Sequence, residues 1–548
     1  MTTVQTLPDT LAECLLRTAE RGEGEYVFHL EDGLVRLSSA ELAERALHGA
    51  RRLAAQGVTP GDRIGVFGPN RPEWVIAAFA TWLAGATVVP IPKPIRVRAR
   101  QLLAQANARL LEMADCRRVL VHPELAALVP EELAMSWDAD GDASAEPPPL
   151  PSGESAAVLQ PTSGSTANPK GALVTHAATM AQLEFLGRRL WEGEDGRRTS
   201  LNWTPYFHDL GLFLNGVISA GVWGTTTHQL PTELFARDPA EWFRLLSSTG
   251  ATMTAAPSSA YGAALRATAG RGERIDLSHV EVVLFGAESV DPGVAERMVQ
   301  GSAGVRFRPE ALGSSYGLAE AVLAVTISPV GAGLRLERLS LDALSRLRAE
   351  PAGERPARIL ASCGRGGDHV ELRIAGPEGV LPERHVGEVQ IQGPSLMERY
   401  VGDDAPDPFV DGWLRTGDLG YLADGELFIA GRLKDMVIVL GQNYYPEDFE
   451  WAAGGLEGVR PGRCVAFGDD VSERLVLLVE PSDERDYLAL ARSVRERVSD
   501  AVGVMPAEVA VVSRGTIEKT TSGKLRRSFM RAAYSNGRVE TLGRSGPR

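Results

Sequence analysis

Short strand-like runs alternate with helical patterns along this chain, and this alternation limits the fold more than any other feature. The β-branched runs Arg63–Phe67 and Thr87–Ile91 flank an apolar segment, Trp74–Leu83, whose composition predicts a helix. A strand, a helix and a second strand in this order form a β-α-β crossover, the connection that joins parallel strands. Val280–Phe285 is a further strand-like run. We therefore predict an α/β architecture with largely parallel sheets.

The length of the chain predicts several subdomains. A single hydrophobic core stops growing near about 250–300 residues, and this chain has 548. The stretch Asp138–Glu154 is rich in Asp, Ala, Pro, Gly and Ser, which predicts an exposed linker. A new strand-like pattern starts at Met436–Leu440, so we predict an N-terminal domain over 1–431 and a small C-terminal domain over 432–548. The segment at about 331–356, rich in Arg, Glu, Leu and Gly, predicts an insertion.

Charge and cysteine content exclude some classes of protein. The formal net charge is −14, and an acidic chain is a poor candidate for sequence-independent nucleic-acid binding, which needs a positive surface. The longest apolar run, Trp74–Val89, is shorter than the roughly 20 residues that cross a bilayer. We expect a cytoplasmic protein with no membrane span. Its reduced thiols, which form no C-x-x-C pair, would be Cys14, Cys116, Cys363 and Cys464.

A run of small hydroxyl residues and glycine, Thr162–Gly171, follows the strand-like run Ala156–Gln160. Such a run lets the backbone approach a phosphate closely, and its hydroxyl and N–H groups donate hydrogen bonds. Lys170 adds a positive charge. The spacing is not that of a Walker A loop. A phosphate site is one interpretation, and a plain surface loop is the commoner meaning of such a run taken alone.

Two further segments carry candidate binding groups. In Tyr316–Glu320 the aromatic ring beside Gly317 can stack on a base, and the carboxylate of Glu320 can hold a divalent cation. Asp418 can accept two hydrogen bonds from a ribose diol, and Arg432 can reach the same sugar or a phosphate. Taken one at a time, such residues are more often ordinary core, surface or hairpin residues.

A lysine near the end of the chain, Lys524, lies within the Gly- and Ser-containing run Lys519–Arg527. A cation on such a turn suits delivery to an active site, where it would neutralise charge that develops on a carboxylate and a phosphate. A solvated basic tail is the alternative, and it is the usual meaning of a short charge run.

In this order, the four segments resemble the adenylate-forming superfamily of acyl and aryl ligases, luciferases and nonribosomal adenylation domains, over nearly the whole chain. The finer resemblance is to fatty acyl-AMP ligases. Trp203–Leu212 is similar to their His-Asp-(Met/Leu)-Gly-Leu signature, Phe285–Val290 to their Gly-Ala-Glu motif, and Ala319 stands where most of the superfamily has Thr. The segment at about 331–356 falls where that group has its insertion.

The resemblance implies a large N-terminal domain of β-α-β subdomains with a β-barrel-like part, and a small, mobile C-terminal α+β domain. It implies ATP and Mg²⁺ as cofactors. The residues that would hold ATP are Thr162, Ser163, Gly164, Ser165, Thr166 and Lys170 at the phosphates, Gly286, Ala287, Glu288, Tyr316 and Gly317 at adenine, and Asp418 and Arg432 at ribose. The other implied roles are Mg²⁺ binding by Glu320, the floor of the acid site at His208, the domain hinge at Lys434 and the catalytic cation at Lys524.

The activity implied by the resemblance is ATP-dependent conversion of a carboxylic acid to acyl-AMP with release of pyrophosphate. In fatty acyl-AMP ligases the insertion is held to disfavour coenzyme A, so the implied acceptor is an acyl carrier protein. The alternatives are an acyl-CoA ligase, an amino-acid-activating domain and a non-catalytic nucleotide-binding protein. Phe213 and Trp223 are bulkier than is usual in the family, either as packing residues or as groups that shorten the acyl tunnel. The sequence leaves the acid open.

Overall fold

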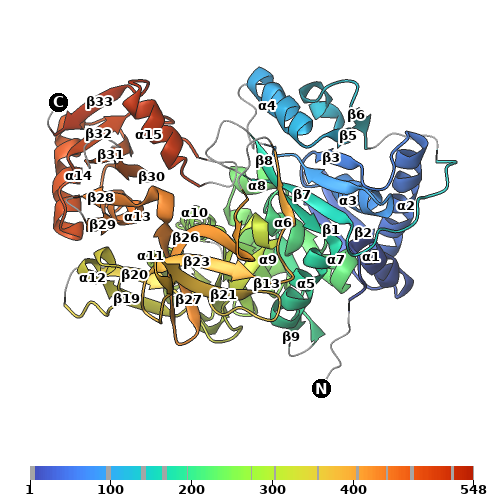
Figure 1. The fold of residues 1–548 in the computed structure, drawn as a ribbon, viewed down its shortest axis with the longest axis horizontal. Coiled ribbons are helices and arrows are strands. Elements are labelled where there is room, and N and C mark those ends of the chain that lie inside the picture. The colour runs from blue at the N-terminus through green and yellow to red at the C-terminus, as the bar shows by residue number, and fades with distance from the viewer. Residues whose placement is uncertain are drawn as a thin grey trace. The chain divides into compact units, whose positions relative to one another are not determined.

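The computed structural model describes residues 7–93, 100–137, 143–162, 169–193, 196–272, 275–301, 304–354, 357–402, 407–439, 442–468, 474–519 and 524–546. The chain forms two compact units. In Figure 1 the colour follows the chain from the N-terminus to the C-terminus. Unit 1 comprises Met1–Leu334, Gly364–Glu371 and Gln392–Asp407, and unit 2 comprises Arg335–Cys363, Leu372–Ile391 and Pro408–Arg548. Unit 2 includes residues on both sides of position 431, so the domain division at 431 and 432 stays a prediction.

Unit 1 is built on two sheets that are mostly parallel. The larger has the strand order β18-β17-β15-β13-β11-β12-β1-β2, and only its outermost strands, β18 and β2, pair antiparallel to their neighbours. Its strands are β1 (Glu25–Leu30), β2 (Gly33–Ser38), β11 (Ser200–Asn202), β12 (Thr226–Gln229), β13 (Met253–Ala256), β15 (Val282–Phe285), β17 (Leu312–Gly317) and β18 (Ala324–Ile327). The predicted parallel α/β architecture is confirmed.

The second sheet of unit 1 has the order β24-β8-β7-β4-β3-β5-β6. Strands β6, β5, β3, β4 and β7 run parallel, whereas β8 and β24 are antiparallel additions at one edge. The strands are β3 (Arg63–Phe67), β4 (Thr87–Pro90), β5 (Cys116–Val121), β6 (Ala134–Ser136), β7 (Ala156–Thr162), β8 (Lys170–Thr175) and β24 (Arg399–Val401). Most strands of this sheet are therefore joined by crossovers rather than by hairpins.

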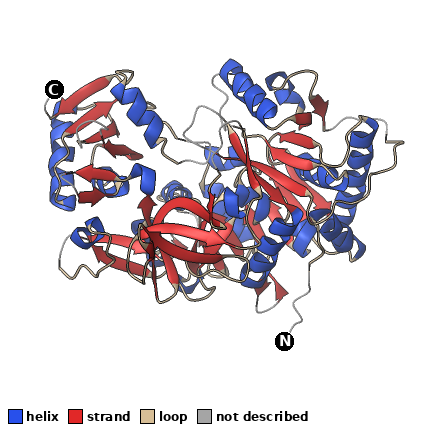
Figure 2. Cartoon of the chain, viewed as in Figure 1, coloured by secondary structure: helices blue, strands red, loops and turns tan. Residues whose placement is uncertain are grey.

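The predicted crossover is present as β3-α3-β4. Helix α3 (Pro72–Leu83) starts with proline at its first position, where a missing N–H costs nothing, and ten of its 12 residues are buried. It is apolar all round because it is covered on every side. Helices flank the strands of unit 1 (Figure 2). Besides α3, the described α-helices of unit 1 are α1 (Leu11–Glu20), α2 (Ser39–Ala55), α4 (Arg100–Met113), α5 (His176–Leu186), α6 (Asp209–Phe213), α7 (Ser219–Trp223), α8 (Thr232–Arg237), α9 (Ala240–Thr249), α10 (Ser258–Thr268) and α11 (Pro292–Gln300).

Unit 2 begins with an antiparallel part in which β27 pairs with β26 of a sheet ordered β22-β21-β23-β26-β25. The barrel-like part that the resemblance implies stays a prediction. The predicted insertion contains a strand, β19, and a short helix, α12. The bounds here are β19 (Leu336–Ser340), α12 (Leu341–Ser345), β20 (Ala357–Ala361), β21 (Glu371–Gly376), β22 (Gly379–Val380), β23 (Gly387–Gln392), β25 (Phe409–Val410), β26 (Trp413–Ala423) and β27 (Glu426–Arg432).

The remainder of unit 2 is a four-stranded sheet, β30-β31-β32-β33, with three helices and a hairpin. Helix α14 is capped by Asp486, whose carboxylate accepts from two backbone N–H groups, and it ends at Gly503, which adopts a φ of 79°. The bounds are β28 (Val437–Val439), β29 (Gln442–Tyr444), α13 (Pro446–Gly454), β30 (Val459–Gly468), β31 (Leu475–Pro481), α14 (Tyr487–Val502), β32 (Glu508–Val512), α15 (Arg527–Ser535) and β33 (Thr541–Ser545).

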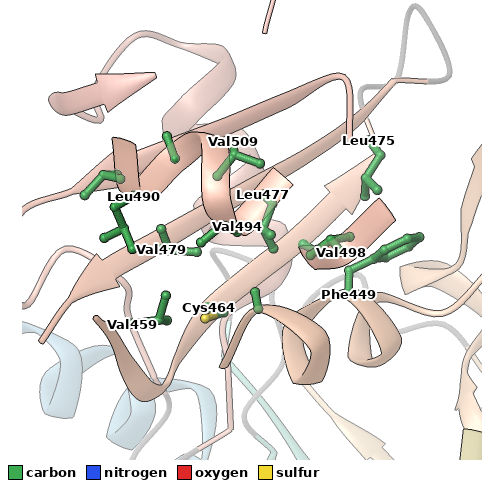
Figure 3. Close-up of a cluster of buried hydrophobic side chains, with 14 of the residues drawn as sticks. Phe449, Val459, Cys464, Leu475, Leu477, Val479, Leu490, Val494, Val498 and Val509 are labelled. Atoms are coloured by element: carbon green, nitrogen blue, oxygen red, sulfur yellow. The ribbon is translucent and has the colours of Figure 1, made fainter. Parts of the chain in front are cut away.

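Strand β31 is buried along its whole length because helices cover both faces of the sheet. Alternate side chains of a strand point to opposite faces, so Leu477 joins the cluster under α14 and Leu478 joins a second cluster with Met530 of α15. Figure 3 shows Val494 and Val498 of α14 in the first cluster. In the part of the chain that the structure describes, no helix is long and apolar enough to cross a membrane.

One buried histidine gives unit 1 a pH-dependent stability. His176, the first residue of α5, is fully buried, and burial lowers its pKa to about 4. An unfolded chain would bind a proton at this position near pH 6.5. As pH falls, the unfolded state therefore gains a proton that the folded state does not bind. The free energy of unfolding falls accordingly between about pH 6.5 and pH 4.

We predict that His176→Asn flattens the fall in urea midpoint between pH 6.5 and pH 4.5, because asparagine keeps an acceptor near Leu11 N but does not titrate. His48→Asn, at an exposed position of α2, is the control and should retain the wild-type slope. Part of the slope should survive, because burial also lowers the pKa of His228 and His369 to about 4. Equal slopes in the two variants would contradict the assignment.

Candidate active site

Several predicted site residues follow the carboxyl ends of parallel strands in unit 1. Gly286 comes directly after β15, Tyr316 lies near the end of β17, and the segment Trp203–His208 follows β11. Strands β17 and β15 are neighbours, with Phe285 opposite Ser314, and β13 connects them to β11. Because the carboxyl ends of parallel strands lie at one edge, these residues emerge on the same side of the sheet, which is where open α/β sheets bind ligands.

Two amides from the second sheet fix the segment that leads to His208. The Asn70 side chain donates to Thr204 O at 2.8 Å and accepts from Tyr206 N at 3.1 Å. Gln160 on β7 donates from Nε2 to Phe207 O at 3.0 Å. Both amides are buried, so these bonds satisfy backbone groups that water cannot reach. The two sheets are thereby joined at the edge that carries the candidate site.

His208 caps helix α6 at the end of that segment. Its Nδ1 lies 3.3 Å from Leu210 N and against the carboxylate of Asp209, and its side chain is 22% exposed. Asn70 and Gln160 were not among the predicted site residues. Their signal in the sequence is their place at or just after strands β3 and β7, at carboxyl ends, but the bonds themselves depend on how the two sheets meet.

The predicted adenine residues lie in a tightly constrained backbone. Gly286 N donates to Ala256 O at 3.2 Å, and Ala287 adopts a φ of 66°, which non-glycine residues rarely do. The carboxylate of Glu288 accepts from Ser259 N at the start of α10. A carboxylate at a helix N-terminus is favourable because unpaired N–H groups gather there. The Glu288 side chain is thus engaged by the N-terminus of α10.

The connection from β17 to β18 carries Glu320 and stores strain. Val322 has a φ of 63° and a ψ of −59°, and Leu323 N donates to Ala321 O at 2.6 Å, the geometry of a γ-turn that a β-branched residue disfavours. A Cβ added to Gly317 would lie 1.8 Å from Leu323 O, so only glycine fits at this position. Strain of this kind persists where the surroundings over-determine it, and it is frequent at functional sites.

Glu320 and Lys170 meet at one tyrosine. The Tyr400 hydroxyl donates to Glu320 Oε1, and Lys170 Nζ lies 3.4 Å from the centre of the Tyr400 ring. Lys170 pairs with Thr162 across the β7-β8 hairpin. The structure therefore brings the flanks of the predicted phosphate loop next to the predicted metal ligand. The predicted residues Ser163, Gly164, Ser165 and Thr166 lie outside the described residues.

The other predicted residues belong to unit 2. Asp418 and Arg432 are opposite each other on β26 and β27, and Arg432 Nε donates to Asp418 Oδ1 at 2.8 Å. The Glu388 carboxylate on β23 accepts from Arg415 Nε at 2.8 Å and from Gly417 N at 3.3 Å on β26, contacts that the sequence alone did not predict because they join separate strands. Lys434 and Lys524, which are both exposed, lie just after β27 and just before α15.

The chemistry of the donors suits Mg²⁺ bound together with phosphates. In the part of the chain that the structure describes, no three His, Cys, Asp or Glu side chains form a metal cluster. Mg²⁺ is usually held by one or two carboxylates, with substrate phosphates and water completing the shell. The half-buried carboxylate of Glu320, next to the flank of the predicted phosphate loop, matches that requirement.

The fold and the arrangement of unit 1 define an adenylate-forming ligase. The chain belongs to the AMP-binding enzyme family, whose model matches residues 16–401. It is 31% identical to the long-chain-fatty-acid–AMP ligase FadD26 of Mycobacterium tuberculosis (strain ATCC 25618 / H37Rv), over 92% of each chain. It is also 31% identical to the 4-hydroxyphenylalkanoate adenylyltransferase of Mycobacterium marinum (strain ATCC BAA-535 / M), over 92% of this chain and 87% of that protein.

Among solved structures, the fold is similar to one from a study of fatty acyl-adenylate ligases from E. coli and L. pneumophila. The TM-score is 0.89 at 28% sequence identity, and the match covers 96% of this chain and 98% of that one. The resemblance to fatty acyl-AMP ligases is thereby confirmed.

We predict that Gly317→Ala weakens ATP binding by roughly tenfold or more, because the methyl group would force the turn that carries Glu320 to move. Calorimetric titration with ATP measures the effect. Gly454→Ala is the control, since Gly454 ends helix α13 with open space around its Cβ position. Wild-type ATP affinity in Gly317→Ala would contradict the importance of this turn.

Proposed function

We propose that this enzyme activates a carboxylic acid as acyl-AMP and then transfers the acyl group to the phosphopantetheine thiol of an acyl carrier protein. The single observation that carries the first half is that Lys170 and Glu320, both in unit 1, contact the same side chain, Tyr400. A cation and a metal-binding carboxylate placed together suit a triphosphate, which needs both.

In the first step, a carboxylate oxygen of the acid attacks the α-phosphorus of ATP. The bond from that phosphorus to the bridging oxygen breaks, and pyrophosphate leaves with the bonding electrons. Thr162, the segment 163–166 and Lys170 would hold the phosphates, and Tyr316 with the backbone of Gly286–Glu288 would hold adenine. Mg²⁺, when bound at Glu320, supplies positive charge to the phosphate oxygens. Little covalent chemistry is asked of the protein, so positioning and charge neutralisation provide the acceleration.

Unit 2 would provide the sugar contacts and the catalytic cation. Asp418, held by Arg432, offers a carboxylate of the kind that accepts hydrogen bonds from a ribose diol. Lys524 would contact the acid carboxylate and the α-phosphate. For the second step the lysine must give way to the incoming thiol, which we assign to rotation near Lys434.

For the acid, the names of the relatives point to a fatty acid or a 4-hydroxyphenylalkanoate. Phe213 and Trp223 are buried, and Trp223 stacks on Trp191 with ring centres 4.7 Å apart. This supports core packing as the role of the two bulky residues. A panel of fatty acids from short to long, with arylalkanoic acids beside them, identifies the acid through acid-dependent ATP–pyrophosphate exchange.

The acceptor is proposed from the insertion. Leu341 of α12 packs against the core of the C-terminal sheet, and Asn443 Nδ2 donates to Ser345 O at 3.4 Å. Just beyond the insertion, Arg358 lies 3.0 Å from Asp448, and both side chains are almost fully buried. These contacts tie the insertion to the part of unit 2 that carries Lys524, so the insertion is placed to influence which thiol acceptor is used in the second step.

We predict that Lys524→Ala reduces acid-dependent ATP–pyrophosphate exchange by about a hundredfold or more, because the transition state loses its neutralising cation. Lys519→Ala is a matched control, because Lys519 forms an isolated antiparallel β-bridge with Leu525, the neighbour of Lys524. This variant should keep near wild-type exchange. Unchanged exchange in Lys524→Ala would refute the assigned role.

We also predict that acyl transfer to a phosphopantetheinylated carrier protein exceeds transfer to coenzyme A by at least about tenfold at equal thiol concentration. The same carrier without its phosphopantetheine arm is the control, and it should remain unacylated. Faster transfer to coenzyme A than to every carrier in a panel would establish an acyl-CoA ligase instead.

A further inference from the structure

Tyr400 lies on an edge strand contributed by a distant part of the chain. Strand β24 pairs antiparallel with β8, and Tyr400 stands opposite Ala172, two positions from Lys170. The segment Gln392–Asp407 belongs to unit 1 although most of its sequence neighbours belong to unit 2. Tyr400 therefore reaches the candidate site because a separate segment adds a strand there.

The hydroxyl of Tyr400 fixes one oxygen of Glu320. It donates to Glu320 Oε1, while Met397 N donates to the backbone oxygen of Glu320 at 2.8 Å. One short segment thus holds both the main chain and the side chain of the residue. A carboxylate whose one oxygen is bonded presents the other in a defined direction, which is how neighbouring groups prepare a metal ligand.

The ring of Tyr400 lies under the ammonium group of Lys170, with Nζ 3.4 Å from the ring centre. An aromatic face attracts a cation through its quadrupole but carries no net charge. It can therefore orient Lys170 without neutralising it. A carboxylate at the same place would cancel the charge that a triphosphate needs, and a lysine or arginine beside Glu320 would compete with the metal for it.

We propose that Tyr400 is a positioning residue that prepares Glu320 for Mg²⁺ through its hydroxyl and Lys170 for the phosphates through its ring. The inference deepens the proposed function and rests on it. The two roles can be tested separately, because loss of the hydroxyl should affect Mg²⁺ binding and loss of the ring should affect ATP binding without metal.

The test titrates each variant by calorimetry with ATP, in the presence of Mg²⁺ and in its absence with a chelator. Tyr400→Phe keeps the ring and removes the hydroxyl, so the Mg²⁺ concentration at half-saturation should rise by roughly three- to tenfold, while metal-free ATP binding stays at the wild-type level. Tyr400→Leu removes both groups and should also weaken metal-free ATP binding, because Lys170 loses its platform.

A second tyrosine provides a matched control. Tyr534, on helix α15 of unit 2, donates its hydroxyl hydrogen bond to Glu508 Oε1 on β32, and the guanidinium carbon of Arg544 on β33 lies 5.9 Å from the centre of its ring. Tyr534→Phe removes the same kind of bond from the same kind of cluster, and it should leave both titrations unchanged. Glu320→Gln combined with Tyr400→Phe should show no Mg²⁺ effect beyond that of Glu320→Gln alone.

A wild-type Mg²⁺ dependence in Tyr400→Phe would overturn the inference. So would equal loss of metal-free and Mg²⁺-dependent binding in that variant, since this is what a purely structural tyrosine predicts. The proposed function fails separately, if the wild-type chain binds ATP but forms no adenylate with any acid of the panel.

Discussion

The site of unit 1 depends on the pairing of buried backbone groups where two sheets meet. Parallel strands end in loops whose N–H and C=O groups are hidden from water, and every such group needs a partner. Asn70, which follows β3, and Gln160, on β7, meet that need for the segment before His208. The amides and the loop belong to different sheets. The hydrogen bonds that satisfy the loop backbone therefore also fix the position of one sheet relative to the other. The position of His208 therefore depends on these hydrogen bonds between distant segments rather than on the local conformational preference of the chain.

Backbone strain also helps to position residues at this edge of the larger sheet. Ala287 and Val322 have positive φ values that their side chains disfavour, and Gly317 has no room for a methyl group. Each lies within two residues of a predicted ligand-binding side chain. A relaxed backbone would place Tyr316 and Glu320 elsewhere, so the strain is compensated by the surrounding packing and by the bonds from Met397 and Tyr400. Rigidity of this kind reduces the ordering that a ligand must impose when it binds.

Much of the fold could be predicted from the sequence because its signals are local. The apolar run that became α3 lies between two β-branched runs, and that order is enough to predict a parallel pair. The roles of Lys170 and Glu320, by contrast, were implied by the resemblance of the ordered motifs to a family, and they stay predictions. The roles of Asn70, Glu388 and Tyr400 could not be predicted, because each depends on a partner from a separate strand. Nor could the γ-turn at Val322, since a β-branched residue argues locally against a positive φ.

A neutral side chain between a cation and a carboxylate resolves a conflict that the proposed chemistry creates. In the proposed mechanism Lys170 and Glu320 act close together on ATP, yet opposite charges at close range would pair with each other instead of binding the triphosphate and the metal. The tyrosine contacts both without a charge of its own, through a hydroxyl on one side and a ring face on the other. Its strand, β24, has few residues and lies at the edge of its sheet, where an added strand disturbs no existing pairing. Adding an edge strand is thus an inexpensive way to bring a distant residue to a site that the parallel strands had already built.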